Sequence, residues 1–297
     1  MEKAKRVVWR LLAASVCVMA VSQAVHADSL DEQRNRYAQI KQAWDNKQMD
    51  TVQALMPTLK DYPLYPYLEY RQITDDLMNQ PTVTVNNFIQ ANPTLPPART
   101  LQSRFVNELA RREDWRGLLA FSPDKPNTTE AQCNYYYAKW ATGQQEEAWA
   151  GAKDLWLTGK SQPNACDSLF GAWRASGKQD PLAYLERIRL AMKAGNTRLV
   201  TALAGQMPSD YQTISTAVIA LANDPNSVLT FARSTGATDF TRQMAAVAFA
   251  SVARDDVENA RLMIPQLVQA QQLNEEQTQE LRDIVAWRLM GTDVTDE

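Results

Sequence analysis

The sequence predicts an all-α protein: an irregular right-handed superhelix of stacked short helical hairpins, an α-solenoid similar to tetratricopeptide arrays. Strand signals are nearly absent, because the 297 residues include only 10 Gly and no Asn-Gly or Asp-Gly hairpin turn. Apolar residues recur three and four positions apart in most segments, which is typical of helices. Most breaks between these segments recur at intervals of about 29 to 35 residues, as expected for repeated helix pairs.

The N-terminus contains the three parts of a secretory signal peptide in their usual order. Basic residues precede an apolar stretch from Leu11 to Val21, and Val25-His26-Ala27 follows with the small residues that signal peptidase reads. The apolar stretch is too short to remain as a membrane anchor. We therefore expect residues 1–27 to be a signal peptide that is cleaved after Ala27. Residues 28–297 are then the exported superhelical domain.

The composition of residues 28–297 excludes several classes of function. This part contains no histidine, because His26 lies in the signal peptide, so Ser-His-Asp or Cys-His nucleophile pairs and His-based zinc sites are excluded. Its 27 basic and 33 acidic side chains give a net charge of −6, without the concentrated basic face of a nucleic-acid-binding protein. We expect no metal, no cofactor, no nucleic-acid partner and no membrane span after signal removal.

Cys133 and Cys166 are the cysteines that remain once the signal peptide, which carries Cys17, is removed. Two cysteines are too few for a four-cysteine zinc site or an iron–sulfur cluster. In an oxidising compartment such a pair more often forms a bridge than a reactive centre. We expect a Cys133–Cys166 disulfide that closes a loop of about 34 residues. The alternative is a pair of buried free thiols.

Residues that start and end helices mark individual elements along the chain. Asp180-Pro181 predicts a helix start, with Asp as the cap and Pro in the first turn, and Gly195-Asn196 predicts the end of that helix. Further starts are expected at Asp210, Asp224-Pro225 and Asn274-Glu275. The last helix is expected to end at Gly291. The apolar stripes comprise Tyr37, Ile40 and Trp44; Val52, Leu55 and Met56; Leu182, Leu185, Ile188 and Met192; and Leu281, Ile284, Val285 and Leu289.

The helices are expected to pair as antiparallel hairpins, because the connections between them span only about 2–6 residues. The segment around Gly143 shows the pattern: an alanine-containing helix, a Gly turn and a Glu-Glu-Ala helix start. Each hairpin in such an array buries one face against the next, which produces a long concave surface without a single globular centre. The expected breaks lie near Lys47, Gln80, Asp114, Gly143, Gly177, Asn223 and Asp255.

An unusual Tyr/Pro string carries a resemblance to a known family. The string runs Leu59-Lys60-Asp61-Tyr62-Pro63-Leu64-Tyr65-Pro66-Tyr67-Leu68-Glu69-Tyr70. With the signal peptide before it and Phe88-Ile89 and Pro93-Thr94 after it, it resembles the beginning of the soluble lytic murein transglycosylases of Gram-negative periplasms. The segments Arg99 to Arg112, Trp115 to Phe121 and Cys133 to Trp140 continue the resemblance, which extends over essentially the whole chain.

The resemblance implies a periplasmic enzyme with an N-terminal superhelix that forms a ring with a linker domain. A lysozyme-like C-terminal domain would sit on this ring and cleave the β-1,4 bond between N-acetylmuramic acid and N-acetylglucosamine. The product would carry a 1,6-anhydro ring, and a single Glu would act first as acid and then as base. Peptidoglycan glycan strands are the implied partner, and cell-wall-synthesis proteins are further candidate partners.

The sequence departs from this family at the catalytic motifs. The family's catalytic Glu is followed by Ser, but the chain contains no Glu-Ser pair and neither a Gly-Leu-Met-Gln nor an Asn-Ala-Gly motif. We therefore assign no catalytic residue and expect this chain alone to be inactive, with the catalytic domain missing from it. Adjacent acids are expected to face water instead of forming a catalytic pair. These pairs are Asp75-Asp76, Glu146-Glu147, Asp255-Asp256 and Glu275-Glu276.

Two groups of aromatic residues remain as candidate sugar contacts. Tyr62, Tyr65, Tyr67 and Tyr70 form the first group, and Tyr135, Tyr136, Tyr137 and Trp140 form the second. Aromatic faces can stack on sugar rings, but the favoured interpretation is that both groups pack helices together. Trp149, Trp156 and Trp173 are expected to pack between hairpins in the same way.

Two functional hypotheses follow from these observations. In the first, the chain is the non-catalytic part of a lytic transglycosylase that positions murein and the catalytic domain. In the second, it is a free-standing periplasmic helical-repeat scaffold for protein interactions. A gene that continues beyond Glu297 into a domain with a Glu-Ser pair would distinguish the first hypothesis from the second.

Overall fold

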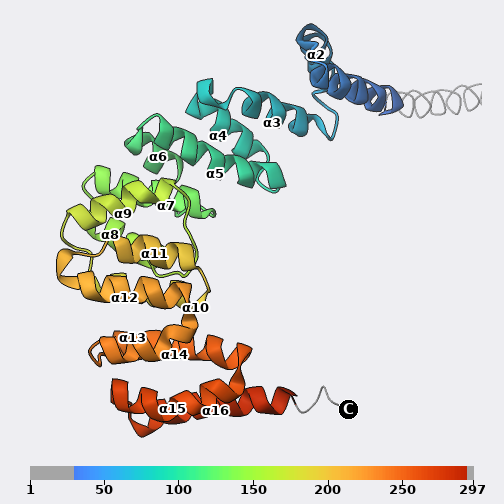
Figure 1. The fold of residues 1–297 in the computed structure, drawn as a ribbon. Helices are drawn as coiled ribbons and strands as arrows, with labels where there is room; N and C mark the ends of the chain where they lie inside the picture. The colour runs from blue at the N-terminus through green and yellow to red at the C-terminus, as the bar shows by residue number, and fades with distance from the viewer. Residues whose placement is uncertain (1–29, 293–297) are drawn as a thin grey trace, which may run out of the picture. The chain divides into compact units, whose positions relative to one another are not determined.

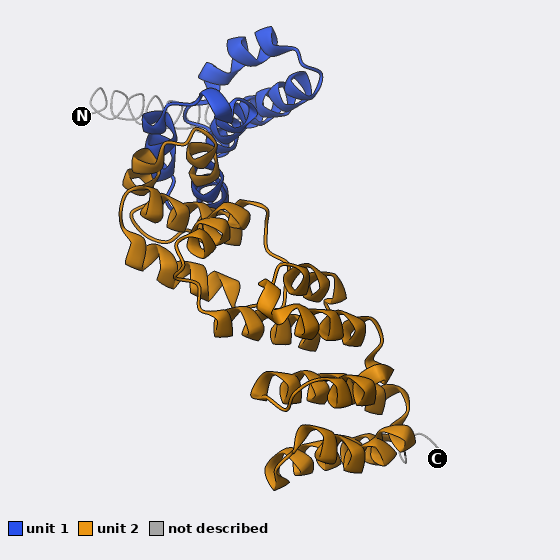
Figure 2. Ribbon diagram, turned by 60° about the vertical axis from the view of Figure 1, so that its left-hand side comes forward, with its two compact units in different colours: residues 1–105 blue, residues 106–297 orange. Residues whose placement is uncertain are grey.

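The computed structural model describes residues 30–292, so the expected signal peptide and the residues after 292 lie outside the described part. Within this part the regular elements are α-helices and short 3-10 turns, and none is a strand. The all-α prediction is therefore confirmed. None of the helices in the described range has the length and apolar character needed to cross a membrane. The chain divides into two compact units, with the boundary after Phe105 (Figure 2).

The described part of unit 1 starts with a helix at residues 30–45 and continues through short helices. Its core contains Ile40, Trp44 and Leu59, and Tyr37 packs against it, so the predicted stripe at the start of the unit faces inward. The Trp44 indole N–H donates to the Asp75 carboxylate over 2.7 Å, which ties the first helix to α3. The other elements are α2 (Met49–Leu55), η1 (Met56–Leu59), α3 (Tyr65–Asp75), η2 (Leu77–Asn79), α4 (Thr82–Ala91) and the first part of α5 (Pro96–Arg111).

Unit 2 is a series of helices in which neighbours along the chain pack side by side (Figure 1). Helix α7 packs against α8 and α9, α11 against α10 and α12, and α14 against α15 and α16. The elements are α6 (Trp115–Phe121), α7 (Thr129–Ala141), α8 (Gln145–Trp156), α9 (Ala165–Ala175), α10 (Pro181–Lys193), α11 (Thr197–Gly205), η3 (Ser209–Tyr211), α12 (Gln212–Asn223), η4 (Pro225–Ser227), α13 (Val228–Ser234), α14 (Asp239–Asp255), α15 (Val257–Gln271) and α16 (Glu275–Thr292).

The core of unit 2 follows the chain from hairpin to hairpin. One continuous cluster of buried side chains runs from Cys133 in α7 to Val285 in α16, and each helix from α7 onward contributes to it. Such a core is expected when each hairpin depends mainly on its neighbours. The predicted Cys133–Cys166 disulfide is present and joins α7 to α9, with 4.9 Å between the Cα atoms.

One connection between helices is repeated at four places: Lys47-Gln48, Glu113-Asp114, Gly143-Gln144 and Gly195-Asn196. The first residue of each pair has a left-handed backbone, with φ between 57° and 91°. The N–H of the second residue bonds back to a carbonyl five residues earlier, as in Gln144 to Lys139 over 2.8 Å, and so closes the preceding helix. The second residue then precedes the first residue of the next helix. Three of the predicted breaks, at Lys47, Asp114 and Gly143, and the predicted end at Gly195 lie in these connections.

The other predicted helix starts agree with the structure except for one. Asp180 caps α10 through the Leu182 N–H over 2.9 Å. Asn274 and Gln277 bond reciprocally at the start of α16. Asp224 caps η4, a short turn that leads into α13. Asp210 lies inside η3 and caps nothing, because the turn already supplies the entry geometry for α12.

Candidate glycan-contact residues and two cavities

The Tyr/Pro string forms the approach to α3, and its tyrosines have different environments. Tyr62 is buried, and its ring centroid lies 5.4 Å from that of Tyr37 in the core of unit 1. Tyr65 is half-buried against the same core. These two rings therefore hold the string against the first helix, as the packing interpretation predicts.

Tyr67 and Tyr70 are both more accessible to solvent than the buried Tyr62. The Tyr67 side chain is exposed at 39%, the largest value in the string's four tyrosines. Tyr70 is partly covered, with its ring 6.3 Å from Phe88 and its hydroxyl accepting from Arg104 over 3.4 Å. Tyr67 is thus the member of this group whose ring is best placed to meet a ligand.

Glu69 lies beside Tyr65 on α3, and sequence analysis did not single it out. Burial raises the pKa of this half-buried carboxyl, and the carboxylate in turn helps to raise the pKa of Tyr65. Residues four apart on a helix share a face, so Tyr65 and Glu69 are neighbours on α3. A partly desolvated carboxylate beside aromatic rings is a suitable acceptor for sugar hydroxyls. The i, i+4 spacing from Tyr65 was the sequence signal that could have identified it.

The second aromatic group divides into buried and accessible parts. Tyr135 is buried, and Tyr136 packs into the α7–α8 contact. Tyr137 and Trp140 instead belong to a row of half-buried rings that also includes Trp115 and Trp149. Neighbouring centroids along this row are 4.9, 5.1 and 6.4 Å apart in the order Trp115, Tyr137, Trp140, Trp149. Trp156 and Trp173 are buried between helices, as predicted.

The adjacent acids have structural partners. Asp75 accepts from Trp44, Glu147 pairs with Lys139 over 2.9 Å, and Glu275 pairs with Arg282 over 3.0 Å. Asp256 caps α15 by accepting from the Asn259 N–H over 3.0 Å. These contacts account for one member of each pair without any catalytic role.

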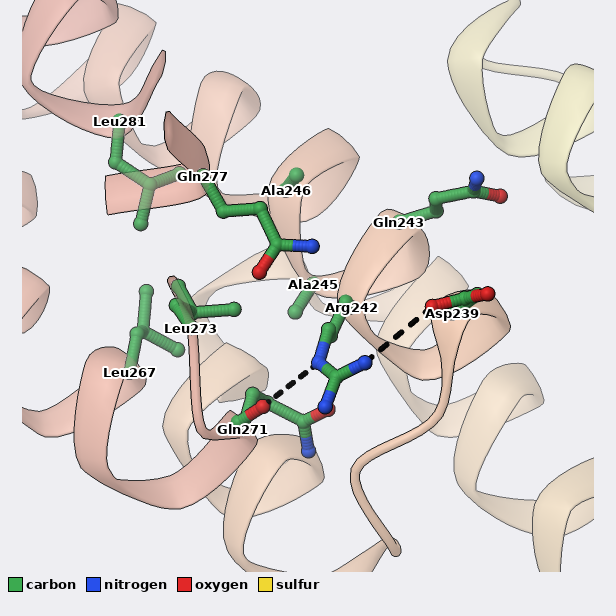
Figure 3. A pocket seen from close by; sticks show the side chains of 10 residues that line it. All are labelled: Asp239, Arg242, Gln243, Ala245, Ala246, Leu267, Gln271, Leu273, Gln277 and Leu281. Atoms are coloured by element: carbon green, nitrogen blue, oxygen red, sulfur yellow. Dashed lines mark hydrogen bonds and ion pairs between the residues drawn. The ribbon is translucent and has the colours of Figure 1, made fainter. Parts of the chain in front are cut away.

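A small cavity of about 110 Å³ lies among α14, α15 and α16 (Figure 3). The Arg242 guanidinium lies between Asp239 and Gln271, pairing with the carboxylate at 3.3 Å and donating to the Gln271 carbonyl over 2.9 Å. The buried Gln271 side chain donates to the Ala232 carbonyl over 2.8 Å and accepts from Thr241 over 2.9 Å. Arg242 and Gln271 therefore already have hydrogen-bonding partners within the protein. We interpret this cavity as a packing gap between helices and not as a ligand site.

A larger cavity of about 400 Å³ lies among α8, α9, α10 and α11. Its wall combines aromatic and aliphatic side chains with two arginines, Arg174 and Arg187. Arg187 is 4% exposed. No group of three or more His, Cys, Asp or Glu side chains in residues 30–292 is arranged to hold a metal ion.

Known proteins match the chain along its full length. It is 84% identical over all 297 residues to the soluble lytic murein transglycosylase of Escherichia coli, and 81% identical over 296 residues to that of Salmonella typhimurium. The whole chain resembles soluble lytic murein transglycosylases. It spans 46% of the length of these relatives. No family model matches it.

Solved structures of lytic transglycosylases share the fold. The crystal structure of the 70 kDa soluble lytic transglycosylase from Escherichia coli matches with a TM-score of 0.85 and 86% identity, covering 90% of this chain and 43% of that one. An inactive mutant of lytic transglycosylase Slt from Pseudomonas aeruginosa matches with a TM-score of 0.74 and 29% identity, covering 86% of this chain and 41% of that one. The predicted resemblance to lytic transglycosylases is confirmed.

Proposed function

We propose that this chain is the non-catalytic superhelical portion of a periplasmic lytic transglycosylase. The whole enzyme would degrade peptidoglycan by cleaving the bond between N-acetylmuramic acid and N-acetylglucosamine, with formation of a 1,6-anhydro ring. The observation that carries the proposal is the 84% identity over the whole chain to a soluble lytic murein transglycosylase. In this proposal the chain is exported by cleavage after Ala27, positions murein and supports a lysozyme-like domain.

The carboxyl groups of the chain support a non-catalytic role. The chain has no Glu-Ser pair. A carboxylic acid that protonates a glycosidic oxygen needs a raised pKa. Among carboxyls with a shifted pKa in residues 30–292, Glu108 and Glu186 are shifted down by hydrogen bonds from arginines, and Glu69 alone is shifted up. Glu69 is therefore the first residue to test if this chain alone cleaves murein.

Tyr67 and Glu69 are proposed as two separate glycan contacts of unit 1, because residues two apart on a helix do not share a face. The exposed ring would stack on a sugar face, and the carboxylate would accept from sugar hydroxyls. Tyr65 and Tyr70 are half-buried, and Tyr62 holds the string in place from the core.

Sedimentation of the purified chain with insoluble murein tests this proposal. The chain should bind murein, and Tyr67→Ala should weaken binding roughly two- to tenfold, as expected for one lost aromatic contact. Tyr67→Phe should retain binding because it keeps the ring. Trp287→Ala is the control, since Trp287 in α16 is exposed at 73% and lies outside the Tyr/Pro string. A chain that remains in the supernatant with murein would overturn the proposal.

A further inference from the structure

Arg187 is a charged side chain held inside the helical stack. It lies on α10 and is 4% exposed. Its guanidinium carbon is 4.3 Å from the ring centroid of Trp156 and 5.3 Å from that of Phe170. The Trp156 indole is itself fixed, because its N–H donates to the Ala183 carbonyl over 2.9 Å. The position of Arg187 is thus set by packing on two aromatic residues.

No ion pair or hydrogen bond compensates this charge within residues 30–292, and Asp167 interacts with it only at longer range. The guanidinium makes no ion pair or hydrogen bond in these residues, and its Nε atom is buried without an acceptor. Cation–π contacts recover only part of the free energy that it costs to bury an unpaired charge. Burial accordingly lowers the pKa of Arg187 to about 10. Such a group is expected to acquire an anion.

Arg187 lines the cavity of about 400 Å³ among α8, α9, α10 and α11. Arg174 provides a second positive charge on the same wall and is exposed, with one N–H donating to Gln206 over 3.3 Å. Asp167 also lines the cavity and partly offsets these charges, but it is exposed and makes no ion pair with either arginine in the described residues. The lining therefore carries one more positive than negative charge.

We propose that this cavity binds a small carboxylate, with Arg187 as its buried anchor and Arg174 as a second, exposed contact. A planar guanidinium presents parallel N–H groups that match the two oxygens of a carboxylate. Leu199, Ala202 and Leu203 supply an apolar wall for a short hydrocarbon part of the ligand. The volume lies in the range of small-molecule sites. This site is independent of the proposed murein contacts at Tyr67 and Glu69.

Titration of the ¹⁵N-labelled chain with butyrate tests the proposal, with the arginine Nε–H resonances as the readout. The Arg187 resonance is identified by its absence in Arg187→Met. It should shift saturably with butyrate and remain unchanged in sodium chloride at the same ionic strength. Butyrate should also raise the melting temperature of the parent chain but not that of Arg187→Met. Arg189→Met is the matched control, because Arg189 is on the same helix but pairs with Glu186, and it should retain binding.

Arg174→Gln gives a second test that leaves the core intact, because this side chain is exposed. It should weaken butyrate binding several-fold while the Arg187 resonance still responds. The proposal is overturned if butyrate produces no saturable shift, or if Arg187→Met retains the butyrate-dependent rise in melting temperature. Tighter binding of inorganic phosphate than of butyrate would overturn the assignment to a carboxylate.

Discussion

The Tyr136 ring of α7 lies against Gly151 of α8, so closely that a Cβ atom at position 151 would overlap the ring carbons. This contact allows the two helices of the hairpin to approach each other. Gly151→Ala should therefore destabilise the protein by about 1–3 kcal/mol, because the ring must move out of a packed site. Urea unfolding followed by circular dichroism measures this change.

Gly171 in α9 is the matched control for Gly151, since a Cβ atom there would meet nothing within 4 Å. Gly171→Ala should stabilise the protein by about 0.5–1 kcal/mol, the usual gain for Ala over Gly inside a helix. Equal effects of the two substitutions on the free energy of unfolding would show that the Tyr136 ring does not restrict the size of the residue at position 151.

The Cys133–Cys166 disulfide should contribute about 2–4 kcal/mol to the stability of unit 2, because it restricts a loop of the unfolded chain between residues 33 apart in sequence. The double variant Cys133→Ser/Cys166→Ser should lose this amount in urea unfolding. Reducing agent should lower the stability of the parent chain and leave that of the variant unchanged. A parent chain insensitive to reduction would contradict a structural role for the bridge.

Glu113 and Gly143 occupy equivalent positions in the repeated helix connection. Substitutions at these two positions should change the free energy of unfolding in opposite directions. Glu113 has φ of 57° and Gly143 has φ of 91°, a region that costs a side chain roughly 1 kcal/mol. Glu113→Gly should raise the free energy of unfolding by about 0.5–1 kcal/mol, and Gly143→Ala should lower it by about 1 kcal/mol. Thermal unfolding of the two variants checks the signs, and a destabilised Glu113→Gly protein would be inconsistent with this account.

Glu108 should make stability depend on pH in acid. Hydrogen bonds from Arg111 at 2.7 Å and Arg112 at 3.0 Å lower the pKa of this buried carboxyl. Because its folded-state pKa lies below the unfolded value of about 4.3, its contribution is present above about pH 4.3 and is lost as the pH falls through the folded-state pKa. Glu108→Gln should cost about 1–3 kcal/mol at pH 7 and less at pH 3.

The control for Glu108 is Glu258→Gln, which removes an exposed ion pair with Arg261. Exposed pairs of this kind contribute little, so this variant should change the free energy of unfolding by less than about 1 kcal/mol at pH 7. Urea unfolding of both variants at pH 7 and at pH 3 shows whether the pH-dependent stability comes from the buried Glu108 and not from the exposed Glu258.

Much of the fold was predictable from the sequence because its signals are local. Helix caps such as Asp180 and turn residues such as Gly143 act within a few positions, and the apolar stripe of Ile40 and Trp44 identifies the buried face. Glu113 was harder to identify, because a left-handed backbone at a non-glycine residue has no clear sequence signal. The division of the chain after Phe105 was also not predicted, since it depends on tertiary contacts.

The candidate sites were less predictable, because each depends on neighbours from distant segments. The tyrosine string identified Tyr67 but could not separate it from the buried Tyr62. The burial of Arg187 depends on Trp156 and Phe170, which lie on two other helices. The apolar stripe predicted for α10 was wrong at two positions, because it included Leu182, which is 70% exposed, and left out Arg187, which is 4% exposed.

The most direct test of the central claim is digestion of murein by the purified chain, with mass spectrometry of the soluble products. The account predicts no 1,6-anhydro-muropeptides from this chain under conditions in which a longer lytic transglycosylase that carries the Glu-Ser motif releases them. Release of anhydro-muropeptides by this chain alone would contradict the account, and its loss in Glu69→Gln would then identify the acid responsible.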